Sequence, residues 1–218
     1  MLHYIFTLGF LLVHTLLLAQ SDTLKLEFTA SDFKFDNGLF LNFNMVKKNK
    51  PISKVQIKTS INYSDYDFFT QLTEQKEITF YDKLGDSQSV RSKHIWGYCN
   101  NGVLFIRFNN EFNRIPLLGN ISHFTANYTY TERNMSNYYS NRYNYYDNHQ
   151  TRTELRQYIF DMETGQIYDF NYQSMLSVLS YDRELLEEYA ALSKRKQKKL
   201  KFLYLRKFNQ NNPIRIYK

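Results

Sequence analysis

Short segments of alternating apolar and polar residues, separated by tight turns, dominate the middle of the chain. Residues 77–82 (EITFYD) and 103–108 (VLFIRF) show the two-residue period of strands with one buried face. Asn37-Gly38 and Asn101-Gly102 are dipeptides typical of hairpin turns. Strands this short, joined by turns this close together, predict an antiparallel β-meander that can curl into a small barrel. The same alternation predicts a further strand over residues 52–57.

The apolar period changes near Asn171, where the pattern becomes helical. Apolar residues recur at spacings of three and four, and Asp182 is a suitable N-cap for the second of three helices. Pro213 ends the last one. The basic C-terminal helical segment therefore covers residues 171–212. The fold class predicted for the chain is α+β, with an antiparallel β-meander or small barrel followed by C-terminal helices.

The first nineteen residues have the pattern of a secretory signal peptide. Between Tyr4 and Ala19 there is no charged residue, and Ala19 supplies the small residue expected before a cleavage site. This apolar stretch is about 16 residues long, whereas a spanning helix needs roughly 20. We predict a signal peptide over residues 1–19 and a single β-rich domain over residues 20–218; the alternatives are an uncleaved anchor or a buried helix. The predicted location is extracytoplasmic, whether periplasmic, associated with the outer membrane or secreted.

A Tyr/Asn-rich insert interrupts the strand pattern at residues 127–150. It holds seven Tyr and six Asn but no Leu, Ile or Val. Without aliphatic residues it cannot build a core of its own, so we expect a long loop or an extension of a hairpin. Tyr-rich loops can bind partners, but a solvated loop is the simpler interpretation.

The excess positive charge belongs to the C-terminal segment alone. Residues 181–218 hold 11 Lys and Arg against 4 Asp and Glu, whereas residues 1–180 hold 17 of each. Two interpretations stay open: a basic helix that faces an anionic surface, or a solvated helix face whose lysines suit the helix dipole. Aromatic residues that could stack bases are not interleaved in the densest basic stretch, 194–201, so no nucleic acid partner is expected. The candidate residues for binding an anionic surface are Lys194, Arg195, Lys196, Lys198, Lys199, Lys201, Arg206 and Lys207.

No motif indicates a catalytic, metal or cofactor site, so none of these residues is predicted and no cofactor is expected. Cys99 with His94 or His123 is the one conceivable nucleophile–base set, but nothing near Cys99 marks it as activated. A lone Cys is more often a small buried apolar residue. Trp96 could line a sugar-binding groove, although such a residue usually belongs to the core.

Three stretches together resemble a family of secreted Bacteroidota proteins whose function is not assigned. They are Gly38–Ile57; Ile78–Phe124, especially Ile95–Cys99 with Asn101-Gly102, Phe112–Ile115 and Gly119–Phe124; and Tyr168–Phe170 with the tail Tyr204–Asn209 and Pro213. The resemblance implies export and one shared architecture. It implies no activity and no catalytic residue.

We therefore expect an exported, non-enzymatic binding or structural protein of the cell envelope, with an unidentified envelope or extracellular partner. Two alternatives remain. One is peripheral binding to an anionic membrane surface through the basic C-terminal helix, and the other is a cryptic hydrolase that uses Cys99 or His123.

Overall fold

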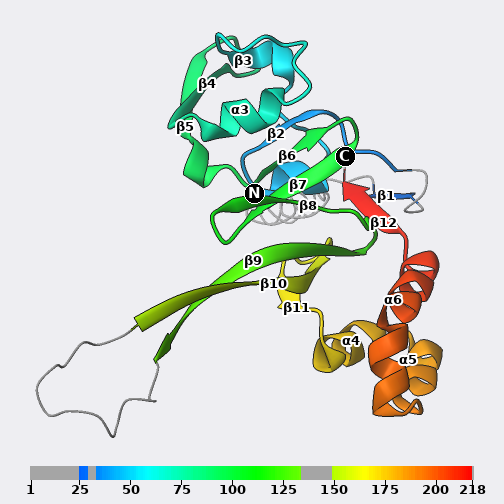
Figure 1. Cartoon of the computed structure of the whole chain (residues 1–218). Helices are drawn as coiled ribbons and strands as arrows, with labels where there is room; N and C mark the ends of the chain where they lie inside the picture. The colour runs from blue at the N-terminus through cyan, green and yellow to red at the C-terminus, as the bar shows by residue number, and fades with distance from the viewer. Residues whose placement is uncertain (1–24, 29–32, 134–148, 218) are drawn as a thin grey trace, which may run out of the picture.

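The computed structural model describes residues 25–28, 33–133 and 149–217 and shows a mixed α+β fold (Figure 1). The described strands form four antiparallel sheets, and three helices near the C-terminus follow all of these strands except the last. The predicted fold class is thus confirmed. The predicted signal peptide, residues 1–19, lies outside the described residues.

The central sheet has four strands in the order β2-β6-β7-β8, and the short helix α2 follows β2. Asn42 caps α2 by accepting a hydrogen bond from the backbone N–H of Met45 at 3.1 Å. The predicted turn at Asn101-Gly102 is confirmed, because both residues take positive φ between the paired strands β6 and β7. The hairpin predicted at Asn37-Gly38 is wrong, because β2 begins at Gly38 and pairs with the distant β6, while the strand before it, β1, pairs with β12. The bounds are β2 (Gly38–Phe40), α2 (Phe43–Lys47), β6 (Gly97–Asn100), β7 (Val103–Phe108) and β8 (Glu111–Arg114).

A second sheet, β3-β4-β5, forms the upper part of the molecule together with helix α3 (Figure 1). The predicted strand over residues 52–57 is mostly wrong. The side chain of Gln56 accepts a hydrogen bond from the backbone N–H of Ser53 and bends this segment into a 3₁₀ helix, Lys54–Gln56. The bounds are β3 (Ile57–Lys58), α3 (Phe68–Glu74), β4 (Glu77–Tyr81) and β5 (Ser87–Arg91).

The third sheet is a long ribbon of β9 (Ile121–Arg133) and β10 (His149–Asp161), with the short β11 (Ile167–Asp169) at one end. The outer half of this ribbon extends away from the body (Figure 1). The predicted insert, 127–150, therefore begins and ends as paired strands, as a hairpin extension would. Residues 134–148 of the insert lie outside the described part of the chain.

The ends of the described chain meet in a two-stranded sheet, in which β1 (Lys25–Phe28) pairs with β12 (Ile214–Tyr217). Between β11 and β12 lie α4 (Tyr172–Leu179), α5 (Arg183–Ala190) and α6 (Lys194–Asn211), gathered at one end of the molecule (Figure 1). Asp182 caps α5 as predicted, because its carboxylate accepts from the backbone N–H of Leu185 at 3.2 Å.

The described strands do not close into a barrel, so that version of the prediction is wrong. After β8 the chain leaves the central sheet, and β9 pairs with β10 instead of continuing the meander. Pro116 lies in this break and has no backbone N–H to donate to a ladder.

The inner part of the ribbon separates two apolar cores. Phe124 and Ala126 on one face of β9 pack with the central sheet, whereas Ile121 on the other face packs with α4, α5 and α6. A third core lies under α3. The ribbon therefore sets where the C-terminal helices sit.

Candidate functional site

The C-terminal half of α6 is fixed to the start of β9 by a pair of buried hydrogen bonds. The side chain of Asn209 accepts from the backbone N–H of Ile121 at 2.9 Å and donates to its carbonyl oxygen at 2.8 Å. Tyr204, Leu205 and Phe208 bury the same half of the helix in the core. Most of the buried side chains of α6 therefore lie in its C-terminal half, whereas in the first six positions only Gln197 is buried.

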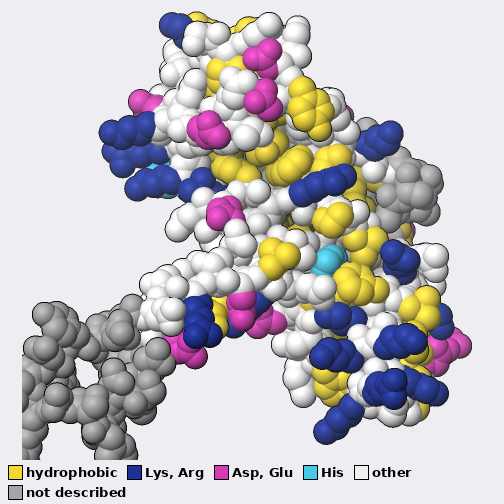
Figure 2. All heavy atoms as spheres, in the orientation of Figure 1, with side chains coloured by type: hydrophobic (Ala, Val, Ile, Leu, Met, Phe, Trp, Pro, Cys, Tyr) yellow, Lys and Arg dark blue, Asp and Glu magenta, His cyan; other side chains and the backbone are white. Residues whose placement is uncertain are grey.

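Five cations occupy the first six positions of α6 and form what we call the basic end. All five side chains are exposed, and none makes an ion pair with an acidic residue of the described chain. Figure 2 shows Lys and Arg side chains gathered over the helices at the lower right. The basic end consists of Lys194, Arg195, Lys196, Lys198 and Lys199.

The basic end lies at the N-terminus of α6, where positive side chains destabilise a helix. The N-terminus of a helix carries partial positive charge, which disfavours cations by a few tenths of a kcal/mol up to about 1 kcal/mol each. Ser193 occupies the N-cap but makes no capping hydrogen bond within the described chain, and no acidic residue lies in the first turn. The interpretation that these lysines suit the helix dipole is therefore wrong. A local rule broken in this way is typical of functional surfaces.

The other three candidate residues lie beyond the basic end. Lys201 is half-buried, donates to the carbonyl oxygen of Phe170 at 3.0 Å and sits 4.1 Å from that ring's centroid. Burial and the nearby charge of Lys198 lower the pKa of Lys201. Lys207 pairs with Glu188 at 2.9 Å, and Arg206 is exposed.

A cavity of about 610 Å³ lies between the basic end, the start of α4 and the end of α5. Three lysines of α6 line it at spacings of four and three, which place them along one face of the helix. None of the described lining residues is acidic. Three aromatic side chains also line the cavity, and they were missed in the sequence because no local pattern links positions 170, 172 and 189. The main lining residues are Lys194, Lys198, Lys201, Phe170, Tyr172 and Tyr189.

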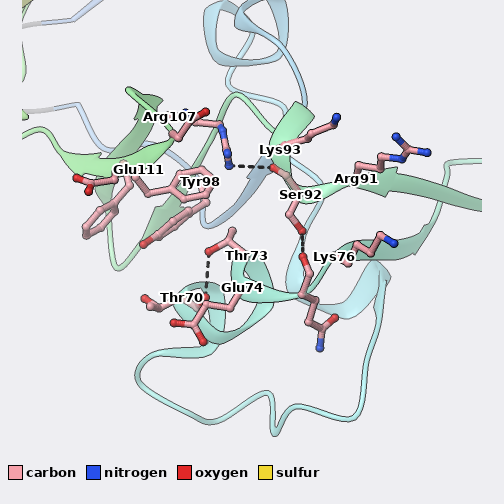
Figure 3. A pocket seen from close by; sticks show the side chains of 14 residues that line it. Thr70, Thr73, Glu74, Lys76, Arg91, Ser92, Lys93, Tyr98, Arg107 and Glu111 are labelled. Atoms are coloured by element: carbon pink, nitrogen blue, oxygen red, sulfur yellow. Dashed lines mark hydrogen bonds between the residues drawn. The ribbon is translucent and has the colours of Figure 1, made fainter. Parts of the chain in front are cut away.

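A larger cavity of about 820 Å³ separates α3 and β5 from β7 and β8 (Figure 3). Arg107 spans part of it, donating to the carbonyl oxygen of Ser92 at 3.2 Å. Tyr98 stacks against Phe105 on the inner side, with ring centroids 4.7 Å apart. Acidic and basic side chains both line this cavity, so it does not select a ligand by charge as clearly as the cavity at α6.

The structure does not bring together the conceivable nucleophile and bases. Cys99 packs in the core on the Phe124 face of β9, whereas His123 lies on the other face against Phe170 and Phe202. Burial raises the pKa of the Cys99 thiol to about 12 and lowers the pKa of His123 to about 4. At neutral pH the Cys99 thiol therefore stays protonated, which disfavours it as a nucleophile.

The surroundings of His94 and Trp96 do not support the catalytic base or the sugar-binding groove considered from the sequence. His94 is exposed at the end of a 3₁₀ helix, Ser92–His94. Trp96 is half-buried against Phe43 and Phe160, with ring centroids 5.9 and 5.6 Å away, which is the core role expected of it. Among the described residues, no group of three or more His, Cys, Asp and Glu side chains is arranged to hold a metal ion.

Comparisons with known proteins give no match. No protein-family model matches the chain, and no curated protein and no solved structure matches it either. The resemblance to secreted Bacteroidota proteins therefore stays a prediction. Within the described ranges, none of the helices combines the length and the apolar character needed to cross a bilayer.

Proposed function

We propose that the protein is an exported, non-enzymatic binding protein that attaches peripherally to an anionic membrane surface through the basic end of α6. One observation carries this proposal. Five exposed cations without an acidic partner in the described chain are gathered at the start of α6, and three of them lie in the first turn, where the helix dipole disfavours them. The partner that best offsets this arrangement is a surface of dense negative charge.

The size of the interaction fits reversible attachment. Each Lys or Arg near an anionic leaflet contributes about 1 kcal/mol, so the five cations together supply at most about 5 kcal/mol. That free energy corresponds to a dissociation constant of a few tenths of a millimolar, expressed as accessible lipid. The attraction acts only within about a Debye length, so it weakens as salt is added.

Cosedimentation with vesicles tests the electrostatic attachment. Mature protein should sediment with phosphatidylglycerol-rich vesicles at 50 mM NaCl and stay in the supernatant at 500 mM NaCl. It should not sediment with phosphatidylcholine vesicles at either salt concentration. A variant with Arg195→Glu, Lys196→Glu and Lys199→Glu should lose binding. A variant with the same charge change at Lys50, Lys58 and Lys83, which are exposed on other parts of the molecule, should keep most of it. Binding that resists salt, or that the first variant retains, would overturn the proposal.

The export half of the proposal rests on the pattern of residues 1–19 and needs a separate measurement. Cell fractionation with the intact mass of the recovered protein supplies it. A mass that begins at Gln20 or Ser21 in an extracytoplasmic fraction supports export. A full-length mass in the cytosol contradicts it, and a full-length mass in the membrane fraction would make residues 4–19 an anchor.

A further inference from the structure

We infer that the cavity between α4, α5 and the basic end of α6 binds the phosphate of an organic phosphate ester, with the organic part against its aromatic wall. This inference deepens the proposed function, because it rests on the same basic helix and names the chemical group that the helix selects. It differs from the proposed function in one respect. A diffuse anionic surface needs only exposed charge, whereas a ligand in the cavity needs three particular lysines.

The charge of the cavity points to an anion with more than one negative charge. Lys194, Lys198 and Lys201 line the cavity from one face of α6, and none of its described lining residues is acidic. Three ammonium groups that line one cavity repel one another, and a single carboxylate would neutralise only one of them. A phosphate monoester carries close to two negative charges at neutral pH and has three terminal oxygens that accept hydrogen bonds.

The donor type also favours phosphate. No Arg lines the cavity among the described residues, so the planar two-point contact that suits a carboxylate is not offered there. Lysines donate as compact charges in several directions, which suits a tetrahedral oxyanion. Lys201 is already positioned by the carbonyl oxygen of Phe170 and the side chain of Gln157, at 3.0 and 2.7 Å. Its ammonium has three N–H donors, so one is left for a ligand.

The volume of the cavity and its aromatic lining allow a ligand larger than a phosphate ion. The cavity measures about 610 Å³, which is within the range of small-molecule sites. Phe170, Tyr172 and Tyr189 form an aromatic wall, in which Tyr172 stacks with Tyr189 at 6.1 Å between ring centroids. Leu192 adds an aliphatic side chain. Apolar surface next to a cationic cluster is complementary to a phosphate attached to an organic group.

Two variants of the same helix separate the cavity from the exposed surface. Lys194→Gln with Lys198→Gln removes two cavity charges, whereas Arg195→Gln with Lys199→Gln removes two charges at the same spacing that do not line the cavity. Binding is measured by calorimetry on the mature chain with four probes. These are inorganic phosphate, glycerol 3-phosphate, and monomeric dihexanoyl phosphatidate and dihexanoyl phosphatidylcholine.

We expect the Lys194/Lys198 variant to bind dihexanoyl phosphatidate roughly tenfold or more weakly, because it loses charge-assisted hydrogen bonds to the phosphate. The Arg195/Lys199 variant should change this affinity by less than about threefold, because its charges act only through solvent. Both variants should weaken vesicle binding to a similar extent, because an anionic surface attracts all four cations. A Tyr172→Ser variant, altered at a partly exposed position, should weaken dihexanoyl phosphatidate binding and leave glycerol 3-phosphate binding unchanged.

The outcomes distinguish the two proposals and the two sources of phosphate. Tighter binding of dihexanoyl phosphatidate than of glycerol 3-phosphate, lost in the Lys194/Lys198 variant, supports a lipid headgroup. Equal binding of the two esters, lost in the same variant, supports a soluble phosphate ester. Equal losses in both variants, or binding of none of the phosphate probes, overturns the cavity site even if vesicles still bind. If the unaltered protein binds the esters but does not bind anionic vesicles, the surface attachment is overturned and the cavity site stands.

Discussion

Replacement of Asn209 by Ala tests how α6 is held against the ribbon. The side chain of Asn209 is 7% exposed and satisfies both backbone polar groups of Ile121. Gly119 makes this approach possible, because a Cβ there would lie 2.2 Å from the amide nitrogen of Asn209. Removal of the amide leaves the N–H and the carbonyl of Ile121 without their partner in a buried place.

The magnitude follows from those two groups. A buried backbone group without a partner costs about 1–3 kcal/mol, so the Asn209→Ala variant should lose about 2–6 kcal/mol of unfolding free energy. That is a large share of the roughly 5–15 kcal/mol typical of a domain. With a urea m-value of about 2 kcal/mol per molar, the midpoint should fall by about 1–3 M.

Urea unfolding followed by circular dichroism measures this loss, and Gln210→Ala is the matched control. Gln210 is the exposed neighbour of Asn209 on α6, so its replacement should change the free energy by less than about 0.5 kcal/mol. The Ile121 amide should also exchange its hydrogen faster in the Asn209 variant. A loss below about 1 kcal/mol, or one equal to that of the control, would refute the view that this bond pair positions α6.

Three further predictions follow from the buried and charged groups. Because the folded-state pKa of His123 is about 4, the unfolded chain gains a proton below pH 6.5 that the folded chain does not, so unfolding free energy should fall by up to roughly 3 kcal/mol between pH 6.5 and 4. A His123→Leu variant should show a flatter pH dependence in urea titrations over that window. The Cys99 thiol, with a pKa of about 12, should not react with a disulfide reagent at pH 8 until the protein is unfolded, and rapid labelling of the native protein would contradict its burial. The pair of Lys207 with Glu188 is partly exposed on both sides and screened by solvent, so Lys207→Ala should leave the urea midpoint close to that of the unchanged protein, and a large fall of the midpoint would show that the pair is not screened.

Local structure was largely predictable because turns and caps depend on neighbouring residues. The Asn101-Gly102 turn, the strand over residues 103–108 and the Asp182 cap of α5 are all confirmed. Each depends on residues that are at most a few positions apart in the chain. The strand over residues 52–57 failed for a related reason, because Gln56 and Ser53 make a local hydrogen bond that the apolar alternation does not reveal.

The site could be predicted only in part. The sequence identified the basic residues of α6 by composition, and their spacing follows from the helical period. The aromatic wall could not be found, because Phe170 and Tyr189 meet the lysines only after α4, α5 and α6 have packed together. The separation of Cys99 from His123 could not be predicted either. His123 points from one face of β9, and Cys99 packs in the core on the other face.

By itself the sequence determined the α+β class, the placement of most strands before the C-terminal helices, and the concentration of charge at the C-terminal end. These properties depend on period, turn residues and composition along short stretches of chain. The tertiary structure alone decided that the strands form four separate sheets instead of a barrel, that β1 pairs with β12, and that the basic end of α6 borders a cavity. These features depend on contacts between residues far apart in the chain, and such contacts leave no period in the sequence.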